Sequence, residues 1–289
     1  MKIALCNGGL ANQTFQYIFS RFVELEGGEP CFLDNAAFYT EHLQHNGYEI
    51  SKVFPNARPR LLSEAFSEDV WEYMTERGNI AQQLRDAGED FTLVAETEDY
   101  RFDGNVVTVP TNEYMPWLAS IKGNVYYHGY WLNQSWLKGR HKGILRHELE
   151  FVPLTDDRNK RYEEEIRKTT SVALHVRRGD YVKLHFDTPV EKYCQAVNIM
   201  KEQLEDAHFF LFSDDMDWCK ANREKMGLQA DAVTFVEGND RDGKNYIDMQ
   251  LMTYCKNVIL ASTSAFSYLA ALLNQNERIG IINMTKRKI

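Results

Sequence analysis

Two adjacent arginines, Arg177 and Arg178, follow an apolar run in the segment Ser-Val-Ala-Leu-His-Val-Arg-Arg-Gly-Asp-Tyr over residues 171–181. A guanidinium group offers parallel N–H donors that match the paired oxygens of a phosphate or diphosphate. Asp180 can neutralise only one of the two charges, so an anionic ligand is the expected partner of the other. A plain Arg–Asp bridge that closes a turn explains the spacing equally well.

The residues before the arginines predict a buried strand over 171–176. Val172, Leu174 and Val176 share one face by the two-residue period, and both faces are apolar, as in a parallel sheet. In open α/β sheets, ligands bind outside the carboxyl ends of the strands. The charged cluster is therefore expected to face the ligand.

Other predicted strands are also followed by polar residues. Gly8 and Gly9 form a turn that lets a ligand approach closely and opens a helix N-terminus, whose amides favour anions. Asp34 follows a second strand over 31–33. The remaining clusters follow the predicted strands 208–212 and 257–261 and consist of Ser213, Asp214 and Asp215, and of Ser262, Thr263 and Ser264.

Strands and helices alternate after a turn near Leu154, where we place a domain boundary. This alternation predicts a parallel sheet with helices on both faces. The predicted elements behind the boundary are strands 171–176, 208–212, 233–236, 257–261 and 279–282, and helices 189–205, 215–227, 245–254 and 264–274. Before the boundary we predict helices 13–25 and 61–85 and strands 3–6, 31–33, 91–95, 106–109 and 124–131. Directly after the boundary we predict a helix over 158–168, with Thr155 as its cap.

Four sequence blocks resemble, in order, the signatures of glycosyltransferase family 11, the α-1,2-fucosyltransferases. Residues 175–180 resemble its His-x-Arg-Arg-x-Asp motif, which α-1,6- and protein O-fucosyltransferases share more loosely. Residues 8–17, 212–215 and 248–252 resemble the other three blocks. Residues 261–270 resemble a further segment of the family, but its Asn is missing and Tyr268-Leu269 replaces two tryptophans.

The resemblance implies an α/β fold of the GT-B type, with two Rossmann-like domains facing across a cleft. Residues 1–154 would form an acceptor-side domain and residues 155–289 a GDP-sugar-binding domain. The implied reaction is the inverting transfer of L-fucose from GDP-β-L-fucose to the 2-hydroxyl of a terminal galactose, in an oligosaccharide or surface-glycan acceptor. The family is regarded as metal-independent, so no cofactor or metal is expected besides the GDP-fucose donor.

The resemblance and the strand-end positions together give the candidate site. The expected catalytic residues are Arg177, Asn12 and Asp34. The residues expected to bind the donor are His175, Arg177, Arg178, Asp180, Ser213, Asp214, Asp215, Asp248, Ser262, Thr263, Ser264, Gly8 and Gly9. The general base is not identified by the sequence, and Asp34 and His45 are hypotheses from position. His42 and His45 have no third ligand nearby, which argues against a metal site.

Composition sets the outer limits. The chain has 289 residues, a net charge of −9 and 44% hydrophobic residues, which fits a globular enzyme and disfavours nucleic-acid binding. Five scattered cysteines without a Cys-x-x-Cys pair indicate reduced thiols in a cytoplasm. No apolar run reaches the length of about 20 residues that spans a bilayer. We expect a cytoplasmic protein of the bacterial type, and peripheral association with the inner face of the membrane stays open.

Two other functions stay open at this stage. A fucosyltransferase of another linkage would share the arginine motif. A catalytically inactive GDP-sugar-binding subunit would explain the eroded segment over 262–269. The sequence does not identify the acceptor glycan or the oligomeric state, nor whether the departures in 262–269 change donor or acceptor specificity.

Overall fold

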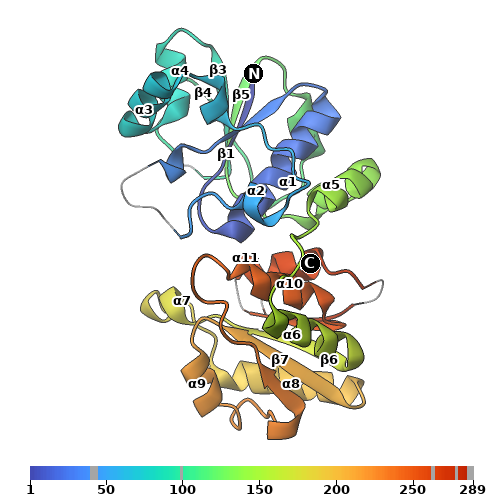
Figure 1. Cartoon of the computed structure of the whole chain (residues 1–289). Coiled ribbons are helices and arrows are strands. Elements are labelled where there is room, and N and C mark those ends of the chain that lie inside the picture. Colours follow the sequence, from blue (N-terminus) through green and yellow to red (C-terminus); the bar gives the residue numbers. More distant parts are fainter. Residues whose placement is uncertain (40–44, 98–99, 262–263, 277–278, 285–289) are drawn as a thin grey trace. The chain divides into compact units, whose positions relative to one another are not determined.

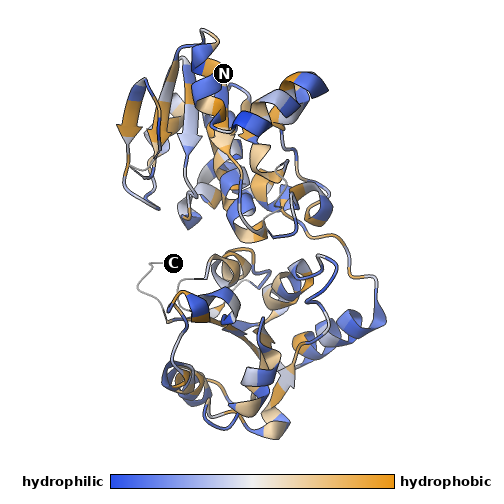
Figure 2. Ribbon diagram, turned by 90° about the vertical axis from the view of Figure 1, so that its left-hand side faces the viewer, coloured by the Kyte–Doolittle hydropathy of each residue, from blue (hydrophilic) through white to orange (hydrophobic). Residues whose placement is uncertain are grey.

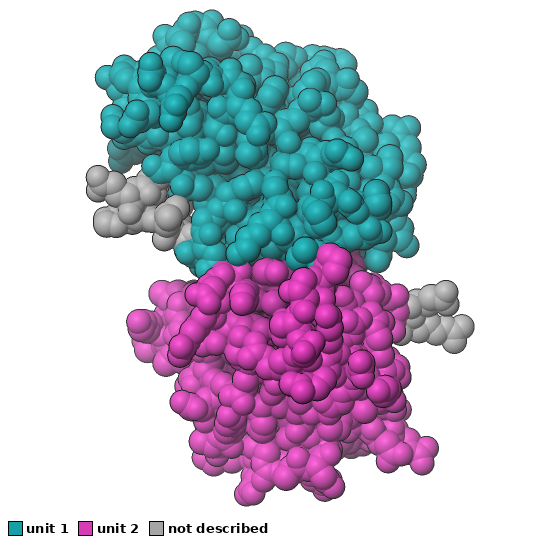
Figure 3. Space-filling view, viewed as in Figure 1, with its two compact units in different colours: residues 1–152 teal, residues 153–289 magenta. Residues whose placement is uncertain are grey.

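The computed structural model describes residues 1–39, 45–97, 100–261, 264–276 and 279–284 (Figure 1). The chain divides into two compact units, Met1–Val152 and Pro153–Ile289, which Figure 3 colours separately. The break lies within two residues of the boundary predicted at Leu154. Ser262, Thr263 and His42 lie outside the described residues.

The first unit contains a parallel sheet with the strand order β2-β1-β5-β3-β4. Its strands are β1 (Lys2–Leu5), β2 (Cys31–Asp34), β3 (Phe91–Ala95), β4 (Asn105–Thr108) and β5 (Asn124–His128). Its helices are α1 (Leu10–Gly27), α2 (Ile50–Val53), α3 (Glu68–Arg77), α4 (Ile80–Asp86) and α5 (Lys142–Glu148), with short 3-10 turns η1 (Ala36–Phe38), η2 (Leu62–Ala65), η3 (Pro116–Ser120), η4 (Gln134–Leu137) and η5 (Gly139–His141). The register pairs Leu5 with Asp34, so both strands reach the same carboxyl edge.

The second unit repeats this architecture with the strand order β10-β9-β6-β7-β8, again parallel. Its strands are β6 (Thr170–Val176), β7 (Ala207–Ser213), β8 (Val233–Phe235), β9 (Asn257–Leu260) and β10 (Gly280–Asn283). Its helices are α6 (Asp157–Lys168), α7 (Gly179–Lys183), α8 (Val190–Gln203), α9 (Met216–Ala221), α10 (Tyr246–Tyr254) and α11 (Ala265–Leu272), with a 3-10 turn η6 (Ala230–Ala232). The alternation of strands and helices predicted from sequence is confirmed.

The central strand β6 is buried on both faces, as its apolar pattern predicts. Val172, Leu174 and Val176 join one hydrophobic core with residues of β7 and α8. Ala173, on the opposite face, is also fully buried. Several strands of each unit are hydrophobic, whereas hydrophilic residues predominate on the outer helices (Figure 2). The core thus fixes the carboxyl end of β6, where the charged residues begin.

Three predictions about helices are wrong. The single helix over 61–85 is divided into η2, α3 and α4. Phe66 and Ser67 have extended backbone conformations between η2 and α3. Gly78 and Asn79, with positive φ angles of 62° and 47°, separate α3 from α4. The cap of α6 is Asp156 rather than Thr155, because the Asp156 carboxylate accepts from the Asn159 amide. The helix predicted over 215–227 ends at Ala221.

The turn between β1 and α1 depends on Gly8. Its φ angle is 75°, and a Cβ atom placed there would lie 2.9 Å from the side-chain nitrogen of Asn12. The side-chain amide of Gln13 stabilises the turn, because its nitrogen donates hydrogen bonds to the carbonyls of Gly8 and Gly47. Its oxygen accepts from the backbone amide of Glu49. The turn and the segment 47–49 are therefore one hydrogen-bonded assembly.

Replacing Gly8 by Ala should destabilise the first unit. An alanine at this position would contact Asn12. It would also have to adopt the left-handed backbone conformation that the turn requires, which costs about 1–2 kcal/mol. Gly143→Ala is the matched control, because Gly143 lies in α5 and a Cβ atom there would meet no described atom within 4 Å. We expect urea denaturation to show a lower unfolding free energy for Gly8→Ala only. Equal stability of the two variants would contradict the described role of the turn.

Candidate functional site

The two arginines that follow β6 are both paired with carboxylates. Arg177 lies 2.6 Å from an oxygen of Asp180 and 2.7 Å from an oxygen of Asp214. The Nε of Arg178 donates to Asp215 at 3.0 Å, and a terminal nitrogen lies 3.4 Å from Asp187. Among the described residues, two arginines thus meet four carboxylates.

The expectation that one of these arginines lacks a partner within the chain is therefore wrong. The sequence argument counted only Asp180, the nearest acidic residue. Folding brings Asp214 and Asp215 from the end of β7, the neighbouring strand, and Asp187 from the loop after α7. The cluster carries a formal excess of two negative charges without a ligand.

The two arginines differ in exposure. The side chain of Arg178 is 14% exposed, and its guanidinium carbon lies 3.9 Å from the centre of the Trp218 ring. Arg177 is 31% exposed, and its partner Asp180 is 52% exposed. Arg178 is therefore enclosed by its own chain, whereas the Arg177 side chain is more exposed to solvent.

The turn after the arginines is fixed by Asp214. One oxygen of this carboxylate accepts from the Arg178 backbone amide at 2.8 Å, and the other pairs with Arg177. A Cβ atom at Gly179 would lie 2.7 Å from the Asp214 carboxylate. Glycine therefore leaves room for the carboxylate to reach both arginine residues.

Ser213 and Asp215 have local structural roles at the end of β7. The hydroxyl of Ser213 accepts from the Asp215 amide at 3.0 Å, and Asp215 caps α9 by accepting from the Trp218 amide. Asp215, and not Ser213, is therefore the cap of the helix that follows β7. Asp215 both caps α9 and pairs with Arg178, so it fixes the arginine relative to the Trp218 ring.

His175, the residue before the last of β6, has its imidazole held in the neutral form. The side chain is buried, and burial, assisted by the neighbouring Arg177 charge, lowers the pKa of His175 to about 3. Its ring centre lies 5.4 Å from that of Phe266 in the first turn of α11. Ser264, the buried residue just before α11, lies in the same region of the chain, so the structure brings the end of β6 and the start of α11 together.

Asp248 belongs to a different polar network in the second unit. It lies in α10 and accepts from the side-chain amide of Asn239 at 2.8 Å. Asn239 is bonded in turn to Asn159 of α6. Burial raises the pKa of Asp248 to about 7, although the Asn239 hydrogen bond opposes this shift. The donor-binding role of Asp248 stays a prediction.

In the first unit, Glu49 lies beside the start of α1. Its side chain is buried, and burial raises its pKa even though the Leu10 amide and Asn46 favour the ionised form. The His45 ring lies 3.5 Å from the position of a Cβ atom on Gly9. A carboxylate thus already lies next to the helix N-terminus that we predicted to hold an anion. The ligand-binding roles of Gly8, Gly9 and Asn12 stay predictions.

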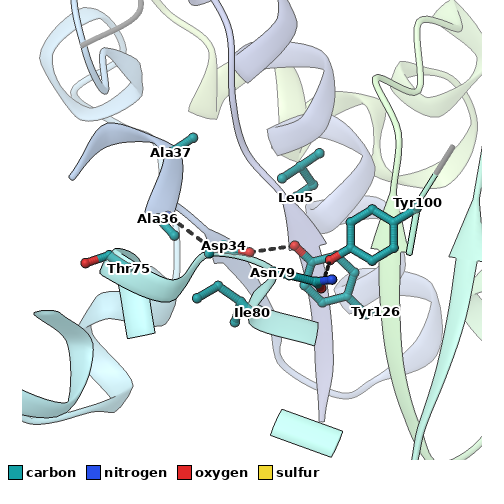
Figure 4. A pocket seen from close by; sticks show the side chains of 10 residues that line it. Leu5, Asp34, Ala36, Ala37, Thr75, Asn79, Ile80, Tyr100 and Tyr126 are labelled. Carbon is teal, nitrogen blue, oxygen red and sulfur yellow. Dashed lines mark hydrogen bonds between the residues drawn. The ribbon is translucent and has the colours of Figure 1, made fainter. Parts of the chain in front are cut away.

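Asp34 lies at the end of β2 and lines a pocket of about 210 Å³ (Figure 4). The hydroxyl of Tyr126 donates to one of its oxygens at 2.5 Å, and the Ala36 amide donates to the other at 3.0 Å. Burial raises the pKa of Asp34, and both hydrogen bonds oppose the rise. Tyr100 lines the same pocket and donates to Asn79 at 2.7 Å.

Sequence reasoning missed another buried carboxylate, Glu96, which follows β3. It accepts from the backbone amides of Asn112, Tyr130 and Trp131 at 2.7–2.9 Å. These bonds end the strand predicted over 124–131 at His128 and hold Trp131 at a φ angle of 55°. The position of Glu96 at a strand end was visible in the sequence, but its backbone partners were not.

The described residues contain no group of three or more His, Cys, Asp or Glu side chains suited to a metal ion. Within the same residues, no helix combines the length and apolar character needed to cross a membrane. The absence of a metal requirement stays a prediction.

Comparisons with known proteins identify the family. The profile of glycosyl transferase family 11 matches residues 113–288. An Escherichia coli protein named alpha-1,2-colitosyltransferase is 30% identical over 285 residues, which are 96% of this chain and 89% of that protein. Galactoside alpha-(1,2)-fucosyltransferase 1 from Bos taurus is 30% identical over 125 residues, 41% of this chain and 33% of that protein. The chain therefore belongs to glycosyl transferase family 11.

The fold is shared with solved structures of more distant sequence. The crystal structure of NodZ alpha-1,6-fucosyltransferase soaked with GDP-fucose superposes with a TM-score of 0.54 at 15% identity, over 94% of this chain and 92% of that chain. The chain is thus a glycosyltransferase with a GT-B-like fold of two parallel-sheet α/β domains.

The raised pKa of Asp248 predicts a pH dependence of stability. In the folded chain the Asp248 carboxyl keeps its proton up to a pKa of about 7. In the unfolded chain the same carboxyl loses it at the ordinary pKa of 3.8. The stabilisation is thus complete below about pH 4 and is lost as the pH rises through about 7. Asn cannot ionise and keeps an acceptor for Asn239, so the melting-temperature advantage of Asp248→Asn over the natural chain should grow from about pH 5 to about pH 8.

Asp231→Asn is the control for this titration, because Asp231 is an exposed carboxylate of the same unit. Its melting temperature should follow that of the natural chain at each pH. A difference between Asp248→Asn and the natural chain that does not change with pH would contradict the assignment.

Proposed function

We propose that the chain transfers L-fucose from GDP-β-L-fucose to the 2-hydroxyl of a terminal galactose in a glycan acceptor, with inversion at the anomeric carbon. The observation that carries the proposal is the partly exposed guanidinium group of Arg177 at the carboxyl end of β6, in a chain of family 11. The family relatives include galactoside alpha-(1,2)-fucosyltransferases, which supports the proposed linkage.

Arg177 can exchange its partner for the donor diphosphate. Its bridge to Asp180 joins residues three apart on the molecular surface, and exposed bridges of this kind contribute about 0–1 kcal/mol. A diphosphate brings more negative charge and paired oxygens, which match the guanidinium fork better. Asp180 then turns to solvent at little cost, and Asp214 keeps Arg177 in place.

Arg178 has a supporting role in this proposal. Arg178 is enclosed by Trp218, Asp215 and Asp187. Loss of a carboxylate partner would be strongly unfavourable, because an uncompensated and partly buried positive charge would remain. It therefore holds the turn beside Arg177 in place. A direct contact of Arg178 with the donor stays a prediction.

The proposed chemistry follows from charge development. As the glycosidic bond breaks, negative charge grows on the departing GDP and the fucosyl ring becomes oxocarbenium-like. A fixed guanidinium donor stabilises the departing charge more than it stabilises the ground state. Arg177 supplies this stabilisation. A single displacement of a β-linked donor gives an α-linked product.

The acceptor side of the proposal rests on the first unit. A galactose hydroxyl loses its proton late in the displacement, either to a base or to solvent. Asp34 is the candidate base with a raised pKa, but it is bonded to Tyr126 and lies on the floor of a pocket. Asn12 lies on the first turn of α1 and is the other candidate for the acceptor side.

A second candidate function is transfer of a colitosyl residue. It is favoured by the relative named alpha-1,2-colitosyltransferase, which aligns over 96% of this chain. A panel of activated sugars with lactose as acceptor separates the two candidates. Linkage analysis of the product separates α-1,2 transfer from another linkage, and donor binding without turnover would indicate an inactive subunit.

Arg177→Ala should lower kcat with GDP-fucose and lactose by about 100- to 1000-fold, the usual effect of losing one donor that stabilises a transition state. Arg177→Lys should recover only part of this loss, because an ammonium group lacks the planar fork. Initial rates and the far-ultraviolet circular dichroism spectrum measure activity and fold together.

Arg241→Ala is the matched control, because the Arg241 side chain is 87% exposed and its nearest carboxylate lies 3.9 Å away. This variant should retain the activity of the natural chain. A folded Arg177→Ala enzyme with undiminished turnover would remove Arg177 from the mechanism.

A further inference from the structure

We propose that the pocket beside Asp34 binds one uncharged sugar ring of the acceptor. This inference rests on the proposed function, because it assigns part of the acceptor to a site within the first unit. The pocket lies at the carboxyl ends of β1 and β2, between these strands and the junction of α3 with α4. Figure 4 shows the Asp34 carboxylate hydrogen-bonded to the Tyr126 hydroxyl, with the Tyr100 ring next to Tyr126.

The size of the pocket fits a single ring. Its volume is about 210 Å³, and the pocket is partly open to solvent. One sugar ring can therefore enter it, with the rest of the acceptor outside.

The walls of the pocket match the two kinds of surface on a sugar. Leu5, Ala36 and Ile80 supply apolar groups, against which the C–H groups of a pyranose can pack. The Tyr100 ring, whose centre lies 4.2 Å from that of His128, supplies an aromatic surface that is already held in place. Asp34, Tyr126, Tyr100 and Asn79 add polar atoms to this apolar lining.

The hydroxyl groups that line the pocket already donate hydrogen bonds within the chain. Tyr126 donates to Asp34, Tyr100 donates to Asn79, and Thr75 donates to the carbonyl of Glu72. Each carboxylate oxygen of Asp34 accepts one hydrogen bond and has room for a second. The Asp34 carboxylate therefore offers acceptor positions to a ligand that brings hydrogen-bond donors, as the hydroxyls of a sugar do.

The charge of the pocket excludes the anionic part of the donor. Its lining contains the carboxylate of Asp34 and, among the described residues, no cationic side chain. A diphosphate would face an unpaired negative charge in a largely apolar space. The pocket is therefore chemically distinct from the arginine cluster of the second unit, and a neutral polyol is the ligand that fits it.

The test measures binding of lactose to the full chain in the presence of GDP by saturation-transfer NMR. Asp34→Asn keeps the shape of the side chain and an acceptor for Tyr126, but removes the charged acceptor. We expect lactose affinity to fall about ten- to hundredfold, the effect of losing one or two hydrogen bonds to a charged group. Asp69→Asn, which changes an exposed carboxylate on α3, should bind lactose like the natural chain.

A second variant fills the pocket without changing its charge. Ala37→Leu places a larger side chain in the lining and should also weaken lactose binding, while calorimetry with GDP should give the natural affinity. If Asp34→Asn does not fold, this variant carries the test alone. Undiminished lactose binding in a folded filled variant, or in folded Asp34→Asn, would overturn the proposal.

Two further results separate this inference from the proposed function. Transfer of fucose to lactose with pocket variants that bind lactose normally would overturn the sugar site and leave the reaction standing. Lactose binding that depends on Asp34, in a chain that neither transfers nor hydrolyses GDP-fucose, would support the sugar site and reject the reaction.

Discussion

The compensation of two arginine charges at the end of β6 is the constraint on which the second unit depends. A guanidinium group next to a buried strand needs negative partners, and the fold supplies them from β7 and from the loop after α7. The compensation is unequal. Arg178 is enclosed, whereas Arg177 keeps a solvent-exposed partner in Asp180 that a stronger anion can replace. One arginine thus maintains the site and the other remains available for a ligand.

The parallel sheet makes this arrangement possible. Adjacent parallel strands end at the same edge, so the residues that follow β6 and β7 meet without a long connection. Gly179 leaves space for the Asp214 carboxylate at the turn. Burial keeps His175 neutral, so the strand adds no third positive charge to the cluster. The first unit uses the same edge differently, because Asp34 there lies in a pocket whose described lining has no cation, and it is bonded to Tyr126.

The sequence predicted the parts of this structure that depend on local pattern. The period of two residues located β6, and the alternation of elements predicted a parallel sheet in the second unit. Contacts between distant segments were not predictable from one sequence. The ring of Trp218 reaches Arg178 only after β7 aligns with β6, and the three backbone amides around Glu96 come from two loops. The prediction of one long helix over 61–85 was wrong. It relied on the apolar pattern and gave too little weight to Gly78 and Asn79, which adopt positive φ angles.

The central claim is that Arg177 exchanges Asp180 for the diphosphate of the donor while Arg178 stays in place. A crystal structure of the chain with GDP tests this claim most directly. The account predicts diphosphate oxygens within hydrogen-bonding distance of the Arg177 guanidinium, Asp180 turned away, and Arg178 still stacked on Trp218. A diphosphate bound away from residues 175–180, or an Arg177–Asp180 bridge left intact beside bound GDP, would contradict it.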